Sequence, residues 1–242
     1  MTMRLFVPEA LVAGTELPLP DAAARHAMVR RVQPGDVLLL FDGRGCDWPA
    51  QVLAVGRHSV SVRVGAPQPV QRELPLRVTL AIAMPANERM DVLVEKATEL
   101  GVALIQPLHS ERSVLRLAGE RAERKRAHWL AIAQAACEQC GRAVLPQVAP
   151  VQDWHDWLRD IGAQPGNGAR WLLSLQPGAQ RVSALGLPAA TLCTVSGPEG
   201  GITADEEDAA RAAGFVAVDL GPRVLRAETA PLAVLAWAAL QR

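Results

Sequence analysis

The stretch TLCTVSGPEGGITADEEDAARAAG, residues 191–214, decides the fold and contains the most informative loop of the chain. An apolar run typical of a strand comes first, and a helix start follows at TADEEDAARAAG. The loop SGPEGGIT between them has three glycines that remove side chains and a proline that stiffens the turn. Loops between a strand and a helix often bind phosphate. Here Glu199 stands in the middle and no lysine follows, which argues against phosphate because a carboxylate repels it.

Strand-like and helix-like segments alternate around this stretch, from residue 76 to the end of the chain. The helical segments include ERMDVLVEKATELG (88–101), closed by Gly101, and ERAERKRAHWLAIAQAACEQCG (120–141). The segments typical of strands are LRVTLAIAM (76–84), VALIQPL (102–108), RWLLSL (170–175), TLCTVS (191–196) and FVAVDL (215–220). This alternation predicts an α/β domain with a parallel sheet.

The first 65 residues have a different pattern. Short β segments separated by Gly, Asp and Arg, such as DVLLLFDG (36–43) and HSVSVRVG (58–65), favour a small barrel, and RHAMVRRVQPGD (25–36) predicts a short helix and a turn. The Pro-rich segment 66–75 is typical of a linker. We therefore expect two domains, residues 1–70 and 71–242, and we expect residues 76–242 to fold and bind a ligand on their own.

The composition narrows the class of protein. Half of the 242 residues are hydrophobic, and 25 basic residues balance 25 acidic ones, which excludes a strongly basic nucleic-acid coat but leaves room for a local basic patch. The chain has no tyrosine, which excludes tyrosine chemistry. Its four cysteines include one CxxC, at Cys137 and Cys140, without the second ligand pair of a zinc site, so no metal is expected. The thiols suit a reducing cytoplasm, and neither a signal peptide nor a membrane span is expected.

A second loop, LGPRVLRAETAP (220–231), also follows a predicted strand and precedes a helix that starts near Thr229. In a parallel sheet, loops after the carboxyl ends of strands line the binding crevice. Two such Gly-Pro loops are expected to enclose one ligand, although each taken alone is more typical of a tight turn. The chain has neither a GxGxxG fingerprint near its first α/β strand nor a Gly-Lys-Ser/Thr phosphate loop. S-adenosylmethionine fits such a site, since it has an adenine, a ribose and a sulfonium but no phosphate.

Several short motifs occur in a specific order: HAMVRRVQPGD (26–36), EKATELGV (95–102), SERS (110–113), EQCGR (138–142), GPEGG (197–201) and LGPRVLRAETA (220–230). Together they make the chain resemble the RsmE family of 16S ribosomal RNA uridine N3-methyltransferases, over nearly its whole length. The resemblance implies a C-terminal trefoil-knotted SPOUT methyltransferase domain and a PUA-like N-terminal β-barrel. It also implies a homodimer that binds 16S rRNA within the small ribosomal subunit. The alternatives are a ribose 2′-O methyltransferase of the same superfamily and a non-catalytic RNA-binding adaptor.

The resemblance also implies a set of cofactor-binding residues for S-adenosylmethionine, which are Leu175, Gly197, Glu199, Gly200, Gly201, Leu220, Gly221, Leu225 and Ala230. Glu199 has an alternative role, in which its carboxylate stabilises a helix N-terminus. The segment SLQPGAQ (174–180) departs from the His-Pro-Arg-like segment of many relatives. Leu175 is therefore expected to contribute backbone or packing contacts.

The catalytic candidates are Arg226 and Glu228. Methylation of N3 of uracil requires removal of the imide proton, which shifts negative charge onto the flanking carbonyl oxygens. A guanidinium aimed at those oxygens would stabilise that charge. Arg226 has this expected role, with an ion pair to Glu228 or Glu199 as the structural alternative. Glu228 is one candidate for the general base and water is the other.

The RNA-binding candidates combine residues of both predicted domains. A basic group on the predicted first helix is expected to contact phosphates, with a solvated helix face as the alternative. Arg142 at a helix end could instead complement the helix dipole. The candidate set is Arg25, His26, Arg30, Arg31, Arg112, Arg142 and Arg223.

Two helices have predictions of their own. Glu95 and Glu99 are expected to form an exposed helical face beside Lys96 rather than an acid-base pair. The last helix, PLAVLAWAALQR (231–242), is apolar on nearly all sides and is therefore expected to be buried, either in a core or in a dimer interface.

Overall fold

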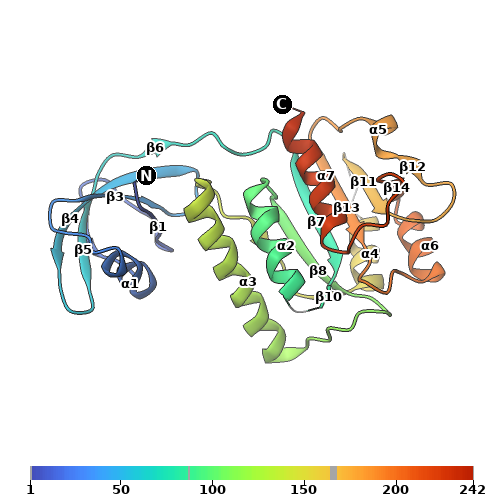
Figure 1. Ribbon diagram of the computed structural model, residues 1–242, viewed down its shortest axis with the longest axis horizontal. Helices are drawn as coiled ribbons and strands as arrows, with labels where there is room; N and C mark the ends of the chain where they lie inside the picture. Colours follow the sequence, from blue (N-terminus) through green and yellow to red (C-terminus); the bar gives the residue numbers. More distant parts are fainter. Residues whose placement is uncertain (1, 87, 164–167, 242) are drawn as a thin grey trace. The chain divides into compact units, whose positions relative to one another are not determined.

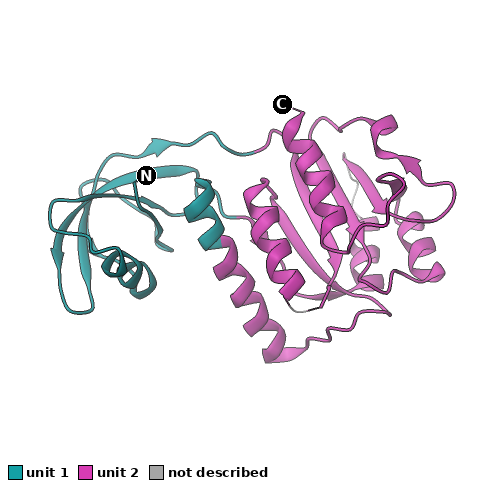
Figure 2. Ribbon diagram, viewed as in Figure 1, with its two compact units in different colours: residues 1–73, 134–145 teal, residues 74–133, 146–242 magenta. Residues whose placement is uncertain are grey.

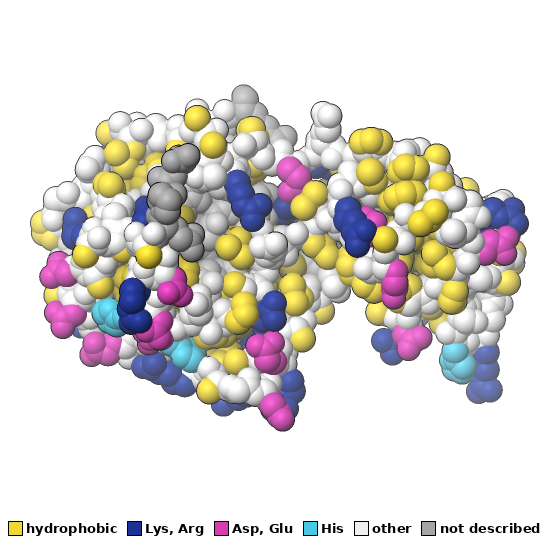
Figure 3. Space-filling view, turned by 180° about the vertical axis from the view of Figure 1, so that it is seen from behind, with side chains coloured by type: hydrophobic (Ala, Val, Ile, Leu, Met, Phe, Trp, Pro, Cys, Tyr) yellow, Lys and Arg dark blue, Asp and Glu magenta, His cyan; other side chains and the backbone are white. Residues whose placement is uncertain are grey.

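The computed structural model describes residues 2–86, 88–163 and 168–241. These residues form two compact units, shown in Figure 2: unit 1 comprises Met1–Glu73 with Gln134–Leu145, and unit 2 comprises Leu74–Ala133 with Pro146–Arg242. On the face shown in Figure 3, acidic and basic side chains are interspersed, as expected for a chain with a formal net charge of zero.

Unit 1 is built on a six-stranded sheet in which all pairs are antiparallel except β1 with β3. The alternation in Val60, Val62 and Val64 places these side chains in the core, while the residues between them point outward. The strands are, in spatial order, β1 (Arg4–Phe6), β3 (Val37–Phe41), β4 (Cys46–Val55), β5 (Val60–Val64) and β2 (Glu16–Pro18), with β6 (Gln68–Pro69) paired to β4.

The first helix, α1 (Asp21–Val29), begins and ends earlier in the chain than the predicted basic helix. Arg30 is its C-cap, and Arg31 adopts the left-handed conformation with φ 58°. The amide of Val32 donates to the carbonyl of Ala27 at 3.3 Å, which closes the helix end in the Schellman pattern. The prediction that Arg30 and Arg31 lie on this helix is therefore wrong, because the backbone reverses direction at Arg31.

The predicted linker is also ordered over part of its length. Gln68–Pro69 form β6, and the amide of Val70 donates to the carbonyl of Gly45 at 2.9 Å. Arg72 donates to the carbonyl of Gly141. Hydrogen bonds fix these residues in unit 1, and the boundary between the two units, at Glu73 and Leu74, lies within the predicted linker.

Unit 2 contains an eight-stranded sheet in which every pair is parallel, which confirms the predicted α/β class. The strands are, in spatial order, β10 (Gln152–Asp153), β8 (Leu104–His109), β7 (Arg77–Ala83), β13 (Thr191–Ser196), β11 (Ala169–Leu173), β14 (Val216–Asp219) and β12 (Gln180–Arg181), with β9 (Gln147–Val148) paired to β8. The helices are α2 (Glu88–Glu99), α3 (Gly119–Cys140), α4 (Trp154–Gly162), α5 (Val182–Leu185), α6 (Ala204–Ala212) and α7 (Thr229–Leu240). The end of α3, from Gln134 on, belongs to unit 1.

The parallel sheet is covered on both faces. In β7, Val78, Leu80 and Ile82 pack with residues of α2, α3 and α7, whereas Ala81 and Ala83 pack with residues of α4 and α6. Figure 1 shows α2 and α7 in front of the sheet. Strands buried on both faces read as continuous apolar runs, which is why their segments are recognisable in the sequence.

The last helix is only partly buried within this chain. Pro231, Val234, Leu235 and Ala238 are buried, but Leu240 is 82% exposed. Leu232 and Trp237 are partly buried against the same core, so α7 is not buried on all sides within the single chain. Burial in a dimer interface stays a prediction.

Candidate functional site

The candidate site lies at the carboxyl ends of three neighbouring strands of unit 2. β11 pairs with β13 on one side and with β14 on the other. The loops that begin at Gly197 and Leu220 are therefore separated by the segment that follows β11, beginning at Ser174. β11 thus lies between the strands that precede the two Gly-Pro loops.

A pocket of about 680 Å³ opens among these three loops. Its lining includes all nine residues predicted to bind a cofactor: Leu175, Gly197, Glu199, Gly200, Gly201, Leu220, Gly221, Leu225 and Ala230. The lining also includes three arginines of the candidate set, Arg112, Arg223 and Arg226. The structure thus brings together predicted cofactor residues that lie as far apart in sequence as Leu175 and Ala230, as expected at a strand-end crevice.

The glycine loop depends on missing side chains. A Cβ on Gly197 would lie 2.8 Å from the side chain of Ile202, so only glycine fits without a shift. Gly201 has φ +71°, a conformation that disfavours every residue with a Cβ, and its amide donates to the carbonyl of Pro198 at 2.9 Å. These constraints hold the loop backbone at the wall of the pocket.

Arg112 braces the same loop from outside its own segment. Its Nη1 donates to the carbonyl of Gly200 at 3.0 Å. Arg112 is predicted to bind RNA, and its position gives it a positioning contact on the glycine loop as well. Nothing in the sequence spacing signals this contact, which joins residues 88 positions apart.

The carboxylate of Glu199 has partners at the start of α2. It accepts from Nη1 of Arg89 at 2.8 Å and from the amide of Ala86 at 3.1 Å. Partial burial raises the pKa of Glu199, but the hydrogen bonds and the Arg89 charge outweigh it and lower the pKa below its ordinary value. Glu199 is therefore an ionised group that joins the glycine loop to α2.

Two buried carboxylates beside the pocket were missed by the sequence prediction. Glu206 caps α6 in a capping box with Thr203 and also accepts from the amide of Glu111 at 2.7 Å. Glu207 lines the pocket, accepts from Oγ of Ser174 at 3.1 Å, and pairs with Arg211 at 2.7 Å. The motif T-x-x-E at 203–206 signals the cap, but the sequence has no signal for the burial of Glu207.

The loop after β14 presents Arg223 and Arg226 on an exposed surface at the pocket. Within the described residues, neither arginine forms an ion pair with Glu199 or Glu228. The alternative role of Arg226, an ion pair with one of these carboxylates, is therefore not observed. Glu228 is not among the lining residues, and its Oε2 is buried without a hydrogen-bond partner in the described part of the chain.

The remaining RNA-binding candidates belong to unit 1. Arg25, Arg30 and Arg31 are exposed, and Nδ1 of His26 lies 3.4 Å from Oε2 of Glu138. Arg142 has 3% of its side chain exposed and makes a two-point contact with Glu73, at 3.0 and 2.5 Å. This buried pair gives Arg142 a structural role and leaves its guanidinium no exposed surface for RNA.

The helix-face prediction for Glu95 and Glu99 agrees with the geometry, since Nζ of Lys96 lies 2.7 Å from Glu95 and 2.8 Å from Glu99.

Across residues 2–86, 88–163 and 168–241, no group of three or more His, Cys, Asp or Glu side chains could hold a metal ion. In the same ranges no helix is long and apolar enough to cross a bilayer.

Comparison with known proteins gives two family matches. The model described as RNA methyltransferase domain matches residues 72–239, and the model described as RNA methyltransferase PUA domain matches residues 19–65. A curated relative, the ribosomal RNA small subunit methyltransferase E of Synechocystis, is 36% identical over 98% of this chain and 77% of its own length.

Two solved structures are similar over nearly the whole chain. A ribosomal RNA small subunit methyltransferase E from Neisseria gonorrhoeae, bound to S-adenosyl methionine, is 38% identical with a TM-score of 0.90, covering 98% of this chain and 96% of its own. A putative methyltransferase from Legionella pneumophila, in complex with the same cofactor, is 32% identical with a TM-score of 0.92, covering 99% and 98%.

Proposed function

The chain belongs to the RNA methyltransferase family that includes the ribosomal RNA small subunit methyltransferases E, and we propose that it methylates nitrogen N3 of a uridine in small-subunit ribosomal RNA with S-adenosylmethionine as methyl donor. The observation that carries this proposal is the pocket of unit 2, which is lined by all nine residues predicted to hold that cofactor. The cofactor-bound relatives, similar over 98% and 99% of the chain, support it.

The pocket residues fit the chemistry of this cofactor. Loops with glycines at positions 197, 200, 201 and 221 present backbone N–H and C=O groups, which suit an adenine edge and ribose hydroxyls. Glu207 adds a carboxylate to the wall, which suits a cationic ligand better than a phosphate. When bound, S-adenosylmethionine supplies an electrophilic methyl group on its sulfonium. The loop residues orient the ligand and exclude water from it.

Arg226 and Arg223 act on the nucleotide in this proposal. Both lie at the pocket on the exposed loop after β14, and neither is held by an ion pair among the described residues. Their guanidinium groups are thus available to donate to uracil carbonyl oxygens or to RNA phosphates. We assign the carbonyl contact to Arg226, because negative charge develops there as the imide proton leaves. Arg223 contacts the RNA.

The imide proton has two candidate acceptors, Glu228 and water. Glu228 follows directly after Ala227, which lines the pocket, and its buried Oε2 has no partner in the described residues. A Glu228→Gln variant separates the candidates. If Glu228 is the base, the variant loses the acidic limb of the pH–rate profile; if water is the base, the profile keeps its shape.

We further propose a cytoplasmic homodimer that binds the RNA with unit 1. The exposed apolar residues of α7, among them Leu240, support a dimer interface. The match of residues 19–65 to an RNA methyltransferase PUA domain supports the assignment of Arg25, His26, Arg30 and Arg31 to RNA contacts. Sedimentation of the purified chain tests the dimer, and a monomer at micromolar concentration would contradict it.

The experiment that tests the reaction uses small ribosomal subunits that lack the modification and a cofactor with a labelled methyl group. Nuclease digestion and mass spectrometry of the product are expected to show label on the base of one uridine. Label on a ribose would indicate the 2′-O methyltransferase instead. No label, with RNA binding retained, would indicate the non-catalytic adaptor.

A further inference from the structure

Two cysteines near the end of α3 have no part in the proposed methyl transfer. Cys137 and Cys140 belong to unit 1, where Cys137 is buried and Cys140 is partly exposed, and both are free thiols. Residues three apart on a helix share one face, with Cβ atoms about 5–6 Å apart. The two thiols lie within range of mutual electrostatic interaction. They form a dithiol, with one member open to small reagents.

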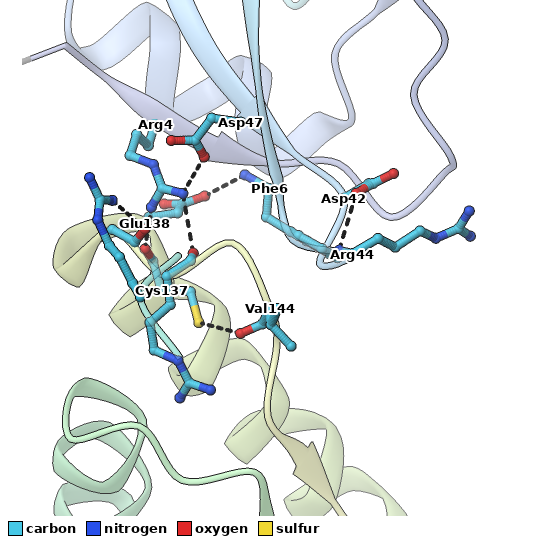
Figure 4. A network of polar contacts seen from close by, with 11 residues as sticks. Arg4, Phe6, Asp42, Arg44, Asp47, Cys137, Glu138 and Val144 are labelled. Atoms are coloured by element: carbon cyan, nitrogen blue, oxygen red, sulfur yellow. Dashed lines mark hydrogen bonds and ion pairs between the residues drawn. The ribbon is translucent and has the colours of Figure 1, made fainter. Parts of the chain in front are cut away.

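The surroundings of the two thiols differ. Sγ of Cys137 also lies 3.7 Å from the carbonyl of Val144, in the network of Figure 4, and Nη1 of Arg4 donates to the Cys137 carbonyl at 2.6 Å. The backbone N–H of Arg142 donates to Sγ of Cys140. The charged groups that face the pair are the guanidinium groups of Arg4 and Arg142 and the carboxylate of Glu73.

This asymmetry separates the titration of the two thiols. The interaction with Cys137 lowers the pKa of Cys140 to about 6. Burial opposes this shift, whereas the Arg142 amide and the charges of Arg142 and Arg4 add to it. The same interaction with Cys140, together with burial, raises the pKa of Cys137 far above its ordinary value. At neutral pH the exposed member is therefore a thiolate and the buried member is a thiol.

We propose that Cys140 and Cys137 form a thiol-modification site for small disulfides of the glutathione class, in which Cys140 attacks and Cys137 resolves. The Cys140 thiolate attacks one sulfur of the oxidant, a Cys140–sulfur bond forms, the oxidant's S–S bond breaks, and one small thiolate leaves. Cys137 then attacks Cys140 sulfur and releases the second small thiolate, which takes the Cys137 proton. The dithiol is oxidised to an internal disulfide and one oxidant molecule is reduced to two thiols.

Closing this disulfide requires a local change of the backbone. A disulfide needs Cβ atoms about 3.5–4.5 Å apart, whereas positions i and i+3 of a helix hold them about 5–6 Å apart, so the last turn of α3 must unwind. α3 ends at Cys140, and Gly141 follows with φ +89°, so the bond would form at a helix terminus and not inside a helix. Once Cys140 is in the mixed disulfide it no longer holds a negative charge beside Cys137, which makes the second attack easier.

The first test measures alkylation of the full-length protein by iodoacetamide as a function of pH. Cleavage after Arg126 and Arg142 gives one peptide with both cysteines, and fragmentation assigns the label. We expect Cys140 to label with a midpoint near pH 6. At that pH it should label about tenfold faster than a thiol of ordinary pKa. Labelling of Cys140 no faster than that of the partly exposed Cys46, or a midpoint above about pH 8, would overturn the proposal.

The second test treats the reduced protein with oxidised glutathione. The wild type is expected to yield the 127–142 peptide with an internal disulfide, two hydrogen atoms lighter than the reduced peptide. Cys137→Ser should stop at a stable glutathione adduct on Cys140, and Cys140→Ser should give neither product. A wild type that remains reduced, or that stops at the adduct, would overturn the proposed resolving role. Because the alkylation test needs only the wild type, poor folding of a variant does not leave the site untested.

Discussion

Gly201 holds its backbone at φ +71° in the wall of the pocket, where no side chain can be placed without strain. We expect Gly201→Val to cost about 1–2 kcal/mol in this conformation. If the loop relaxes to relieve that cost, affinity for S-adenosylmethionine should fall about tenfold. Calorimetric titration of the folded variant measures this fall.

Gly178 provides the matched control for that variant. It has φ +89° and open space around its Cβ position, but it is not among the pocket-lining residues. Gly178→Val should lower thermal stability and leave the cofactor affinity unchanged. Equal affinity of Gly201→Val and the wild type would remove the Gly201 backbone from the binding site.

Arg226 gives a prediction about chemistry rather than binding. If its guanidinium stabilises charge on the uracil oxygens, Arg226→Ala should lower kcat about 100-fold, as the loss of one oxyanion donor does. Cofactor affinity should change little. Arg223→Ala is the comparison, and it should raise KM for RNA with a smaller change in kcat. Parallel losses of kcat and cofactor affinity in Arg226→Ala would show that the residue only shapes the loop.

At the same scale, the pocket was predictable where residue type alone limits the backbone. Gly197 and Gly201 occupy positions that a Cβ would disturb, so their presence in a loop after a strand is informative. Glu207 and Ser174 were not predictable, because a glutamate on a helix and a serine after a strand are ordinary at exposed positions. Only the fold shows that Glu207 is 6% exposed and hydrogen-bonded to Ser174. The burial of Arg142 was equally hidden, because its partner Glu73 is 69 residues away in sequence. Arg142 was therefore predicted to contact RNA.

At the scale of elements, Asp91 joins α2 to α3. Its carboxylate accepts from Nζ of Lys125 at 2.9 Å and from Nε1 of the buried Trp129 at 3.0 Å, and it lies 2.9 Å from Nε2 of His128. Asp91→Ala leaves the Trp129 N–H without its acceptor. We expect a loss of about 1–3 kcal/mol in the free energy of unfolding, measured by urea denaturation.

The same contact has a pH dependence with a definite sign. Partial burial raises the pKa of Asp91, but the hydrogen bonds from His128 and Lys125 outweigh it and lower the pKa below its ordinary value of 3.8. Ionised Asp91 therefore stabilises the fold above the unfolded pKa, and this contribution is lost as pH falls through the lower, folded pKa. The stability difference between wild type and Asp91→Ala should be full near about pH 6 and should shrink below about pH 4. A difference that grows on acidification would contradict the role of the carboxylate.

The elements of unit 2 were more predictable than those of unit 1. Strands such as β7, with residues Val78 to Ala83 buried on both faces, stand out as apolar runs. Short strands such as β6 are fixed by pairing with a distant partner, so their own sequence carries no periodicity to detect. Sheet order was equally hidden, because the position of β11 between β13 and β14 depends on contacts between distant segments.

At the scale of the molecule, the division into two units does not follow one cut in the chain. Residues Gln134–Leu145 belong to unit 1, where Cys137 and Ala143 pack with Phe41 and the buried Arg142 pairs with Glu73. A fragment of residues 76–242 would lose both Phe41 and Glu73. Because an uncompensated buried charge costs about 3–5 kcal/mol, we no longer expect that fragment to fold as stably as the sequence pattern suggested.

The RNA-binding role of unit 1 is therefore tested best in the full-length chain. Arg30 lies at the end of α1, is exposed, and forms no ion pair within the described residues. Each phosphate contact contributes about one unit to the slope of log affinity against log salt. Arg30→Glu should weaken binding of small-subunit RNA and reduce that slope by about one, with unchanged affinity for S-adenosylmethionine. Arg57→Glu is the charge-matched control, since Arg57 is an exposed turn residue of unit 1 outside the basic segment. An equal reduction in both variants would mean that RNA responds to the overall charge of unit 1, and that the basic segment is a solvated surface.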